Sequence, residues 1–481
     1  MSALAGAAAL RSIDDLPGPR GWPVLGMLPQ VDRPHFHAQV EGWLRAHGPM
    51  IAFRLARQRI VVVGDAEALG AMLRDRPEGF RRTPRLAAIS RELGLAGGVF
   101  GAEGEAWKRQ RRMVMAGFDP RHLRAYFPKL AVTAGRLRAR WLAAAQASAP
   151  IDLQGDLMRF TVDAISGLAF GADINTLESD ADVIQRHLDR IFPTIFRRLL
   201  APVPTWRWWR TKADREVDAS VAAVTVAIRG FITAARERLA ADPAGREQPA
   251  NLLEAMLVAA DTDGSGIDEQ DIAGNVMTML LAGEDTTAHT LAWAIDFLHR
   301  HPDAWARARA EVDAVCGPGS DPAGWTLERF ASLPWLEACA SETMRLKPVA
   351  PALTLQALRD TVVSGVRLPK GTIVWGALRQ PSLEPRHFAD PDRFDPTRWL
   401  EGAMPAPGSL SANRVNMPFG AGPRVCPGRQ LALLEMKIAL AVLVGGFEIA
   451  SLETAHGGPP DERLSFTMAP EPLTMRLAAR A

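Results

Sequence analysis

The pattern of hydrophobic and polar positions changes several times along the chain. Residues 102–346 are dominated by alanine-rich stretches with apolar residues at helical spacing. Short apolar or alternating runs occur at residues 50–65 and 360–378, where they predict a hairpin and further strands. Residues 429–447 form another helical run, and strand-like segments follow at 464–478. The pattern therefore predicts a mainly α fold with small β-sheets.

We find no internal repeat and no clean linker, so we expect a single domain over residues 1–481. Residues 1–20 are expected to be an extended or poorly ordered lead-in, because residues 16–26 are rich in proline and glycine. The apolar start of the chain is too short for a bilayer, which needs about 20 residues. No transmembrane anchor is expected.

Charge and cysteine content narrow the class of protein. Lys and Arg number 56 and Asp and Glu 54, so the net charge is +2 and does not favour a nucleic-acid partner. The three cysteines, Cys316, Cys339 and Cys426, are far apart and form no CxxC pair. This pattern favours the reducing cytoplasm over a disulfide framework. Cys339 lies in a helix-like run and is expected to be a buried apolar residue.

Residues 267–301 predict one long helix with an irregular middle. Ala282 and Thr286 are four apart and share a face, and Gly283 lies between them. Small residues there leave room for a flat group, and Asp285 beside the Thr286 hydroxyl suits a proton relay. A kink with incidental charges explains the same residues equally well.

Glu342 and Arg345 are three apart in another predicted helix and can pair. An exposed pair would contribute little, whereas a buried pair with a third partner would be a rigid structural latch. Arg393 and Arg398 are the candidates for that partner.

Cys426 lies in an irregular stretch of glycines, prolines and arginines at residues 419–429. A phosphate loop is excluded because Val425 stands at the third glycine position. A redox thiol is disfavoured because no resolving cysteine is near. As a single thiolate ligand, Cys426 points to haem rather than an iron–sulfur cluster. Gly422 and Gly428 then allow close approach of a flat cofactor, and Arg424 can reach an anionic group on it.

This stretch resembles the haem-binding motif of the cytochrome P450 family, Phe-x-x-Gly-x-Arg-x-Cys-x-Gly, and the resemblance extends from about residue 16 to the C-terminus. The other family motifs occur in the family's order: Trp-x-x-x-Arg, the oxygen-activation motif, Glu-x-x-Arg and the segment that supplies the third latch residue. The matching residues are Trp107, Arg111, Ala282, Gly283, Asp285, Thr286, Glu342, Arg345, Arg398, Phe419, Gly422, Arg424, Cys426 and Gly428.

The resemblance implies the cytochrome P450 fold, a triangular prism with haem b between the long helix and the cysteine loop. Cys426 would bind the iron, Trp107 and Arg111 would contact the haem propionates, and Asp285 and Thr286 would supply protons. The implied activity is a monooxygenase acting on a hydrophobic small molecule. NAD(P)H would supply electrons indirectly, through a ferredoxin or flavodoxin with its reductase. A cytoplasmic monomer is expected.

Two alternatives on the same fold remain: a peroxide-dependent peroxygenase, and a non-enzymatic haem-binding protein or gas sensor.

Four surface or pocket expectations depend on the resemblance. A basic partner surface would comprise Lys108, Arg109, Arg112, Arg429 and Lys437. Residues 86–89, 276–280 and 350–355 would line an apolar pocket. Trp206, Trp208 and Trp209 would form a lid, a shallow membrane contact or a packed loop. Gln356 or Arg359 is a candidate to hold the second propionate.

Overall fold

The computed structural model describes residues 10–95, 97–179, 184–319, 321–400 and 410–480. The chain divides into two compact units, which are described separately. One comprises residues 1–84, 350–392 and 405–425, and the other residues 85–349, 393–404 and 426–481. Residues 1–9 of the expected lead-in lie outside the described part. Arg11 and Ser12 already make ordered contacts, with Gly365 and with a short helix at Ile13–Asp15.

A five-stranded sheet forms the centre of the first unit, with strand order β1-β2-β8-β5-β3. Its first two strands are the predicted hairpin, with Met50 opposite Val63. Val61, Val63 and Val374 are fully buried under helix α2, as expected for β-branched residues in a sheet. The elements of this unit are α1 (Phe36–His47), β1 (Met50–Leu55), β2 (Gln58–Val63), α2 (Ala66–Arg74), β3 (Phe80–Arg82), β5 (Ala352–Ala357), β6 (Thr361–Val363), β7 (Val366–Leu368), β8 (Ile373–Ala377) and α14 (Ala412–Val415).

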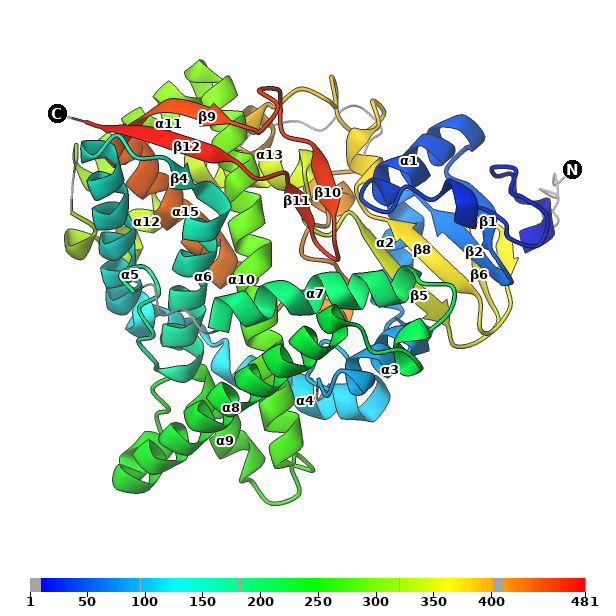
Figure 1. The fold of residues 1–481 in the computed structure, drawn as a ribbon, viewed down its shortest axis with the longest axis horizontal. Coiled ribbons are helices and arrows are strands. Elements are labelled where there is room, and N and C mark those ends of the chain that lie inside the picture. Colours follow the sequence, from blue (N-terminus) through cyan, green and yellow to red (C-terminus); the bar gives the residue numbers. More distant parts are fainter. Residues whose placement is uncertain (1–9, 96, 180–183, 320, 401–409, 481) are drawn as a thin grey trace, which may run out of the picture. The chain divides into compact units, whose positions relative to one another are not determined.

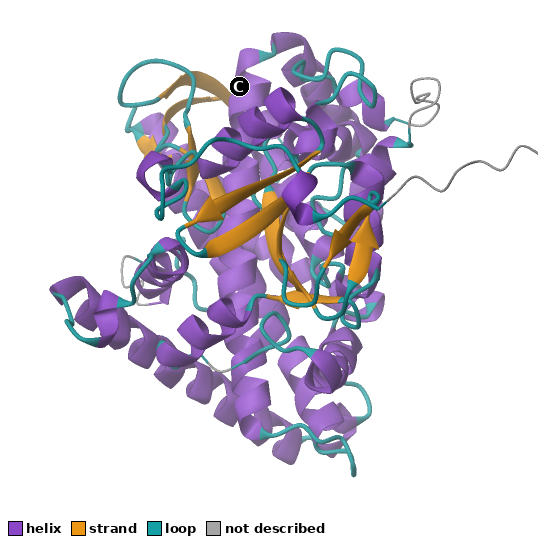
Figure 2. Ribbon diagram, turned by 90° about the vertical axis from the view of Figure 1, so that its right-hand side faces the viewer, coloured by secondary structure: helices purple, strands orange, loops and turns teal. Residues whose placement is uncertain are grey.

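The second unit is mostly helical, and its strands are short. Figure 2 distinguishes the helices and strands of the protein by colour. Its helices are α3 (Pro84–Glu92), α4 (Gly104–Gly117), α5 (Pro120–Gln146), α6 (Leu153–Phe170), α7 (Ile184–Leu200), α8 (Lys212–Ala241), α9 (Leu252–Ala260), α10 (Glu269–Arg300), α11 (Pro302–Cys316), α12 (Leu327–Ala331), α13 (Pro334–Leu346) and α15 (Arg429–Gly446). Its strands are β4 (Ile151–Asp152), β9 (Phe447–Glu453), β10 (Glu462–Leu464), β11 (Met468–Pro470) and β12 (Thr474–Ala479).

Helix α10 is the predicted long helix and packs alongside α6 (Figure 1). Asp268 caps its start through a capping box with Asp271, which satisfies free N–H groups of the first turn. Pro302 begins the next helix, so α10 ends at Arg300. The helix is buried on most sides because α6, α13 and α15 all pack against it.

By length and composition alone, α8 is the one helix among the described residues that could cross a membrane. About a third of its most apolar window, 33%, is buried inside the protein, and α8 packs against α7 and α9. Core helices pass the same test, so this is weak evidence for a membrane span.

Candidate active site

Helix α10 presents one accessible side in an otherwise buried stretch. Between residues 274 and 298, the residues with accessible surface are Thr278, Ala282, Gly283, Asp285 and Thr286. Ala282 is exposed although it lies in the middle of a core helix. Since these positions follow the helical repeat, they lie along one side of α10 and border an open space. The side contains the acid and the hydroxyl that the sequence singled out.

The side chain of Thr286 hydrogen-bonds to the preceding turn of α10, and the helix is regular at this position. The hydroxyl donates to the carbonyl of Ala282 at 2.7 Å, and Thr290 bonds in the same way to the carbonyl of Thr286 at 2.8 Å. The predicted irregularity is therefore one of hydrogen bonding and not a break, since α10 is one continuous helix. The oxygen of Thr286 retains acceptor capacity on the accessible side.

Gly283 lies where α6 approaches α10 closely. A Cβ atom at this position would lie 3.0 Å from Cγ1 of Ile165, closer than ordinary packing allows. One helical position on, the carbonyl of Glu284 accepts a hydrogen bond of 3.1 Å from Thr161 of α6. The small residue thus lets the two helices approach each other at the edge of the accessible side of α10.

Cys426 is the exposed cysteine of the three, whereas Cys316 and Cys339 are buried. Enough protein surrounds its sulfur that burial raises the pKa of the thiol. The backbone N–H of Gly428, which caps the start of α15, and the charge of Arg111 both act to lower that pKa. A metal cation at the exposed sulfur would complete the deprotonation, because coordination strips a thiol of its proton.

Helix α4 places Trp107 and Arg111 one turn apart, with Trp107 buried. Burial lowers the pKa of Arg111, and the negative Cys426 acts against that shift. A partly desolvated arginine that interacts electrostatically with the thiolate could also pair with an anionic group of a bound cofactor. This is the position at which the sequence motif predicts a propionate contact.

The part of the cysteine loop that belongs to the first unit has two glycines with positive φ. Gly420 has φ 73° and Gly422 has φ 71°, and a side chain is strained in that region. A Cβ atom at Gly422 would also lie 2.6 Å from the carbonyl oxygen of Leu73, so helix α2 excludes any larger residue. Phe419 and Arg424 lie on either side of this turn and are half-buried.

The latch residues come together as expected. Arg345 donates two hydrogen bonds of 2.8 Å to Glu342, and both side chains are fully buried. Arg398 Nε donates to Glu342 Oε1 at 3.3 Å, whereas Arg393 contributes only its carbonyl, to Arg345. The sequence missed Trp399, whose indole N–H donates to Glu342 Oε2 at 2.8 Å.

Two further polar contacts around α10 were not found from the sequence. Gln110 of α4 accepts from the amide of Asn275 on α10 at 3.2 Å, which fixes these helices beside each other. Glu435 of α15 is completely enclosed, so burial raises its pKa well above the ordinary value, and Thr287 on α10 donates to it. Nothing in the sequence around Glu435 indicates burial. The residue lies in the core because α15 packs on α10.

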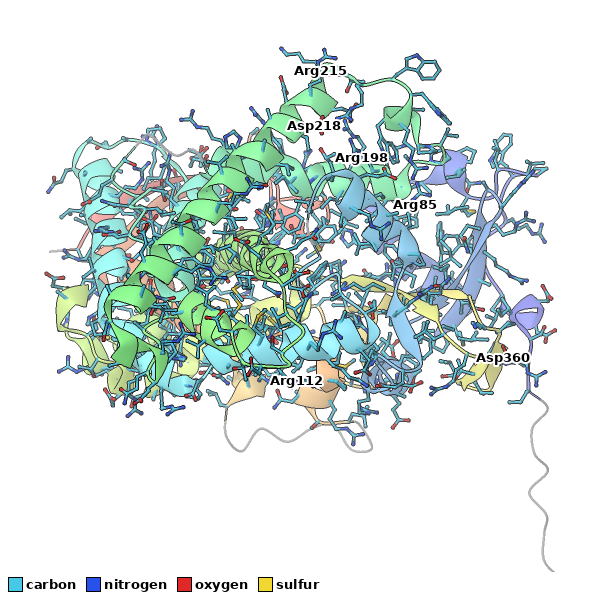
Figure 3. All side chains as sticks on the ribbon, turned by 90° about the horizontal axis from the view of Figure 1, so that it is seen from below. Arg85, Arg112, Arg198, Arg215, Asp218 and Asp360 are labelled. Carbon is cyan, nitrogen blue, oxygen red and sulfur yellow. The ribbon has the colours of Figure 1, made fainter. Side chains whose placement is uncertain are left out.

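The expected basic surface needs one correction, and the two candidates for the second propionate have partners of their own. Lys437 does not belong to a basic surface, because its amine is buried and donates to the carbonyl of Phe330 and to Glu337, both at 2.9 Å. The helices packed around α15 enclose it, because residues 433–445 of that helix are all buried, whereas Arg112 and Arg429 are exposed (Figure 3 labels Arg112). Gln356 and Arg359 are engaged within the first unit, by Arg81 and Asp75.

The tryptophan segment divides into a packed part and an exposed part. Trp206 is buried and its indole N–H donates to Glu92 at 2.8 Å, so the packed-loop interpretation holds for this residue. Trp208 and Trp209 are exposed by 63% and 72%. Arg85, close to Arg198 in Figure 3, secures the segment by donating to the carbonyl of Arg198 at 2.9 Å.

The predicted pocket segments differ in accessibility. Residues 276–280 are buried except for Thr278, and in residues 86–89 only Ile89 is buried. Leu355, in the first unit, is buried in the sheet core, whereas Ala352 to Thr354 are half-buried. The accessible apolar surface on α3 and α10 is therefore smaller than the segments named from the sequence.

Comparison with known proteins identifies the class. A sequence model described as cytochrome P450 matches residues 16–477, so the chain belongs to the cytochrome P450 family. Among solved structures, a cytochrome P450, CYP102L1, has a TM-score of 0.80 and 27% identity, and the match covers 97% of this chain and 99% of that one. The P450DA haem domain, with a TM-score of 0.82 and 24% identity, shows the same fold over 98% of this chain and 99% of its own.

The curated relatives are P450 enzymes from plants and animals. Flavonoid 3'-monooxygenase CYP75B3 of Oryza sativa subsp. japonica is 30% identical over 93% of this chain and 86% of its own length. The mitochondrial 25-hydroxyvitamin D-1 alpha hydroxylase of Rattus norvegicus is 28% identical, over 93% of this chain and 90% of its own. The protein is therefore a P450 monooxygenase, and the family implies haem as its cofactor.

Proposed function

We propose that the protein inserts one oxygen atom of O2 into a hydrophobic small molecule, by hydroxylation or epoxidation. The single observation that carries the proposal is the setting of Cys426, an exposed residue at which the backbone N–H of Gly428 and the charge of Arg111 act to lower the thiol pKa, against the effect of burial. When bound there, haem supplies the oxygen chemistry, which its thiolate ligand promotes.

Residues of this chain would hold the haem. Cys426 would bind the iron, and the positive-φ turn at Gly422 would let the backbone pass close to the cofactor. Arg111 would pair with a carboxylate of the cofactor, and Trp107 lies one turn away on the same helix. The sequence motif assigns Arg424 the same role. The accessible side of α10, formed by Ala282, Gly283 and their neighbours, leaves space on a helix that is otherwise buried.

Proton supply falls to Asp285 and Thr286. Both retain accessible surface, and Thr286 has a free acceptor lone pair because its own proton is donated to Ala282. Thr286 would hold a water in place, and Asp285 would connect that water to solvent. A peroxygenase needs no such pair, so these residues favour O2 over peroxide as the oxidant.

Electrons would come from NAD(P)H through a ferredoxin or flavodoxin with its reductase, and a cytoplasmic location suits such partners. Arg112 and Arg429 are exposed cations that an acidic partner would contact. The named flavonoid monooxygenase and hydroxyvitamin D hydroxylase among the relatives support oxygen insertion into a small molecule.

A two-arm turnover assay tests the proposal. The purified holoprotein is given a panel of hydrophobic ligands chosen by their spin-state shift, with either NADPH plus ferredoxin and reductase or hydrogen peroxide. We expect product in the first arm. Product in the peroxide arm alone would establish the peroxygenase, and spin shifts without product in either arm would establish a binding protein.

A further inference from the structure

His289 lies on the accessible side of α10, one turn beyond Thr286. It follows Thr286 by three residues and Asp285 by four, so it continues the same side of the helix. The residue is buried, with 7% of its surface accessible. The imidazole therefore belongs to the helical side that Ala282 and Thr286 occupy, where the accessible stretch gives way to buried positions.

The two nitrogens of this ring have different surroundings. Nδ1 is completely enclosed and has no hydrogen-bond partner among the residues that the structure describes. Nε2 is not enclosed in this way, so it is the nitrogen at the accessible end of the ring. No neighbouring charge offsets the burial of this histidine, and desolvation alone lowers its pKa to about 4. The ring is neutral at physiological pH and carries one N–H.

The location of that proton follows from the cost of enclosing each form. An enclosed N–H without an acceptor is rarer in proteins than an enclosed lone pair without a donor. The tautomer with the lone pair on Nδ1 and the proton on Nε2 is therefore the more stable one. His289 then directs a hydrogen-bond donor toward the space beside Thr286.

The hydroxyl oxygen of Thr286 can accept a hydrogen bond from a water, and that water needs a donor of its own. The hydroxyl proton of Thr286 is committed to the carbonyl of Ala282 at 2.7 Å, which leaves its oxygen as an acceptor. A water that donates to Thr286 is held more firmly when a second group donates to that water's own oxygen. His289 is placed one helical turn away, within the reach of a single water.

We propose that His289 is a positioning residue of this site, whose Nε2–H holds the water or small ligand that Thr286 also binds. The inference rests on the proposed function, because it assigns the group that orients the proton source of the α10 acid–alcohol pair. Nothing in the two-residue motif itself contains this histidine, so the assignment comes from the helix geometry and the enclosed Nδ1.

Carbon monoxide bound to the reduced holoprotein is a suitable probe, because its stretching frequency responds to a nearby hydrogen-bond donor. His289→Phe removes the donor and keeps the ring volume. His289→Gln keeps an N–H at a similar reach. Trp293→Phe is the matched control, since Trp293 lies one turn further on the same side and its enclosed indole N–H also has no partner.

We expect the CO stretch to rise in His289→Phe and to stay near the wild-type value in His289→Gln and Trp293→Phe. Peroxide released per NADPH should increase about three- to tenfold in His289→Phe, the factor that one hydrogen bond contributes. Rescue by His289→Gln is expected in both measurements.

Two outcomes would overturn the inference, and they are distinguishable. An unchanged CO stretch and unchanged coupling in a folded His289→Phe holoprotein would make His289 a packing residue only, which a raised melting temperature would corroborate. A wild-type protein whose CO complex lacks the thiolate spectrum would overturn the proposed function, and this inference with it.

Discussion

The carboxylate of Glu342 and the guanidinium of Arg345 lie entirely inside the protein and share two hydrogen bonds of 2.8 Å. The remaining acceptor capacity of Glu342 is taken by Arg398, by the indole of Trp399 and by the backbone N–H of Asp395. Such a pair is tolerated in a core because every polar atom finds a partner. It joins α13 to the segment at residues 393–399.

Removing one member of this pair should lower the stability of the protein strongly. In Arg345→Leu the buried Glu342 loses its counter-charge, so we expect the free energy of unfolding to fall by about 3–5 kcal/mol. Urea denaturation followed by circular dichroism measures this change. Arg393→Ala is the control, because Arg393 contributes only its backbone and should change stability by less than about 0.5 kcal/mol. Equal losses in the two variants would refute the latch.

The hydroxyl of Thr286 should govern the coupling of oxygen use to product. Thr286→Ala removes the acceptor on the accessible side of α10, so we expect product per NADPH to fall by about tenfold or more. Thr286→Ser should retain most coupling. Thr290→Ala is the matched control, since this threonine makes the same backward bond but is buried. If Thr286→Ala and Thr290→Ala couple equally well, Thr286 has no role in proton supply.

Gly422 should tolerate no side chain, for two separate reasons. Its φ is 71°, and a Cβ would meet the carbonyl of Leu73 at 2.6 Å. Gly420 has nearly the same φ of 73° but open space around it. We expect Gly420→Ala to lose about 1–2 kcal/mol from the backbone alone and Gly422→Ala to lose clearly more. Unfolding curves and haem content per protein measure both, and similar values would show that the contact with α2 is unimportant.

The stability of the α7–α8 region should depend on pH below 4. Burial acts to raise the pKa of Asp214, but hydrogen bonds from Thr211 and Arg198 outweigh it and lower the pKa from 3.8 to about 2. A group with a lowered folded pKa stabilises the protein above its unfolded pKa, and loses that effect as pH falls through the folded value. Asp214→Asn should therefore be less stable than wild type at pH 7, with the difference narrowing between about pH 4 and pH 2.

Asp218→Asn supplies the comparison for that experiment. Asp218 forms an ion pair with Arg210 in which both side chains are 46% exposed, and such pairs contribute about 0–1 kcal/mol. Its stability should change little at any pH. A constant difference between Asp214→Asn and wild type from pH 7 to pH 2 would contradict the lowered pKa.

The fold class and the positions of the main elements follow from the sequence. The long helix was predicted over residues 267–301 and is observed at Glu269–Arg300, because its capping acids and the proline after its end are local signals. The hairpin at residues 50–65 is predictable for the same reason, since alternation and register are short-range. The role proposed for Cys426 comes from its motif.

What the sequence did not predict depends on long-range packing. Lys437 and Glu435 lie in the same apolar helix, and only the helices around α15 decide that both are enclosed. The indole of Trp399 reaches Glu342 across 57 positions of sequence, a distance at which spacing carries no information. Trp206 and Trp208 are two residues apart, yet one binds Glu92 and the other is exposed, which no periodicity distinguishes.

The most direct test of the account is the spectrum of Cys426→Ser. The reduced, CO-bound wild-type protein should show the thiolate Soret band at about 450 nm. Cys426→Ser should lose this band in preparations that still bind haem, whereas Cys316→Ser and Cys339→Ser, whose sulfurs are buried, should keep it. A band that survives in Cys426→Ser would show that another residue binds the iron, and would contradict the assignment of Cys426 as its ligand.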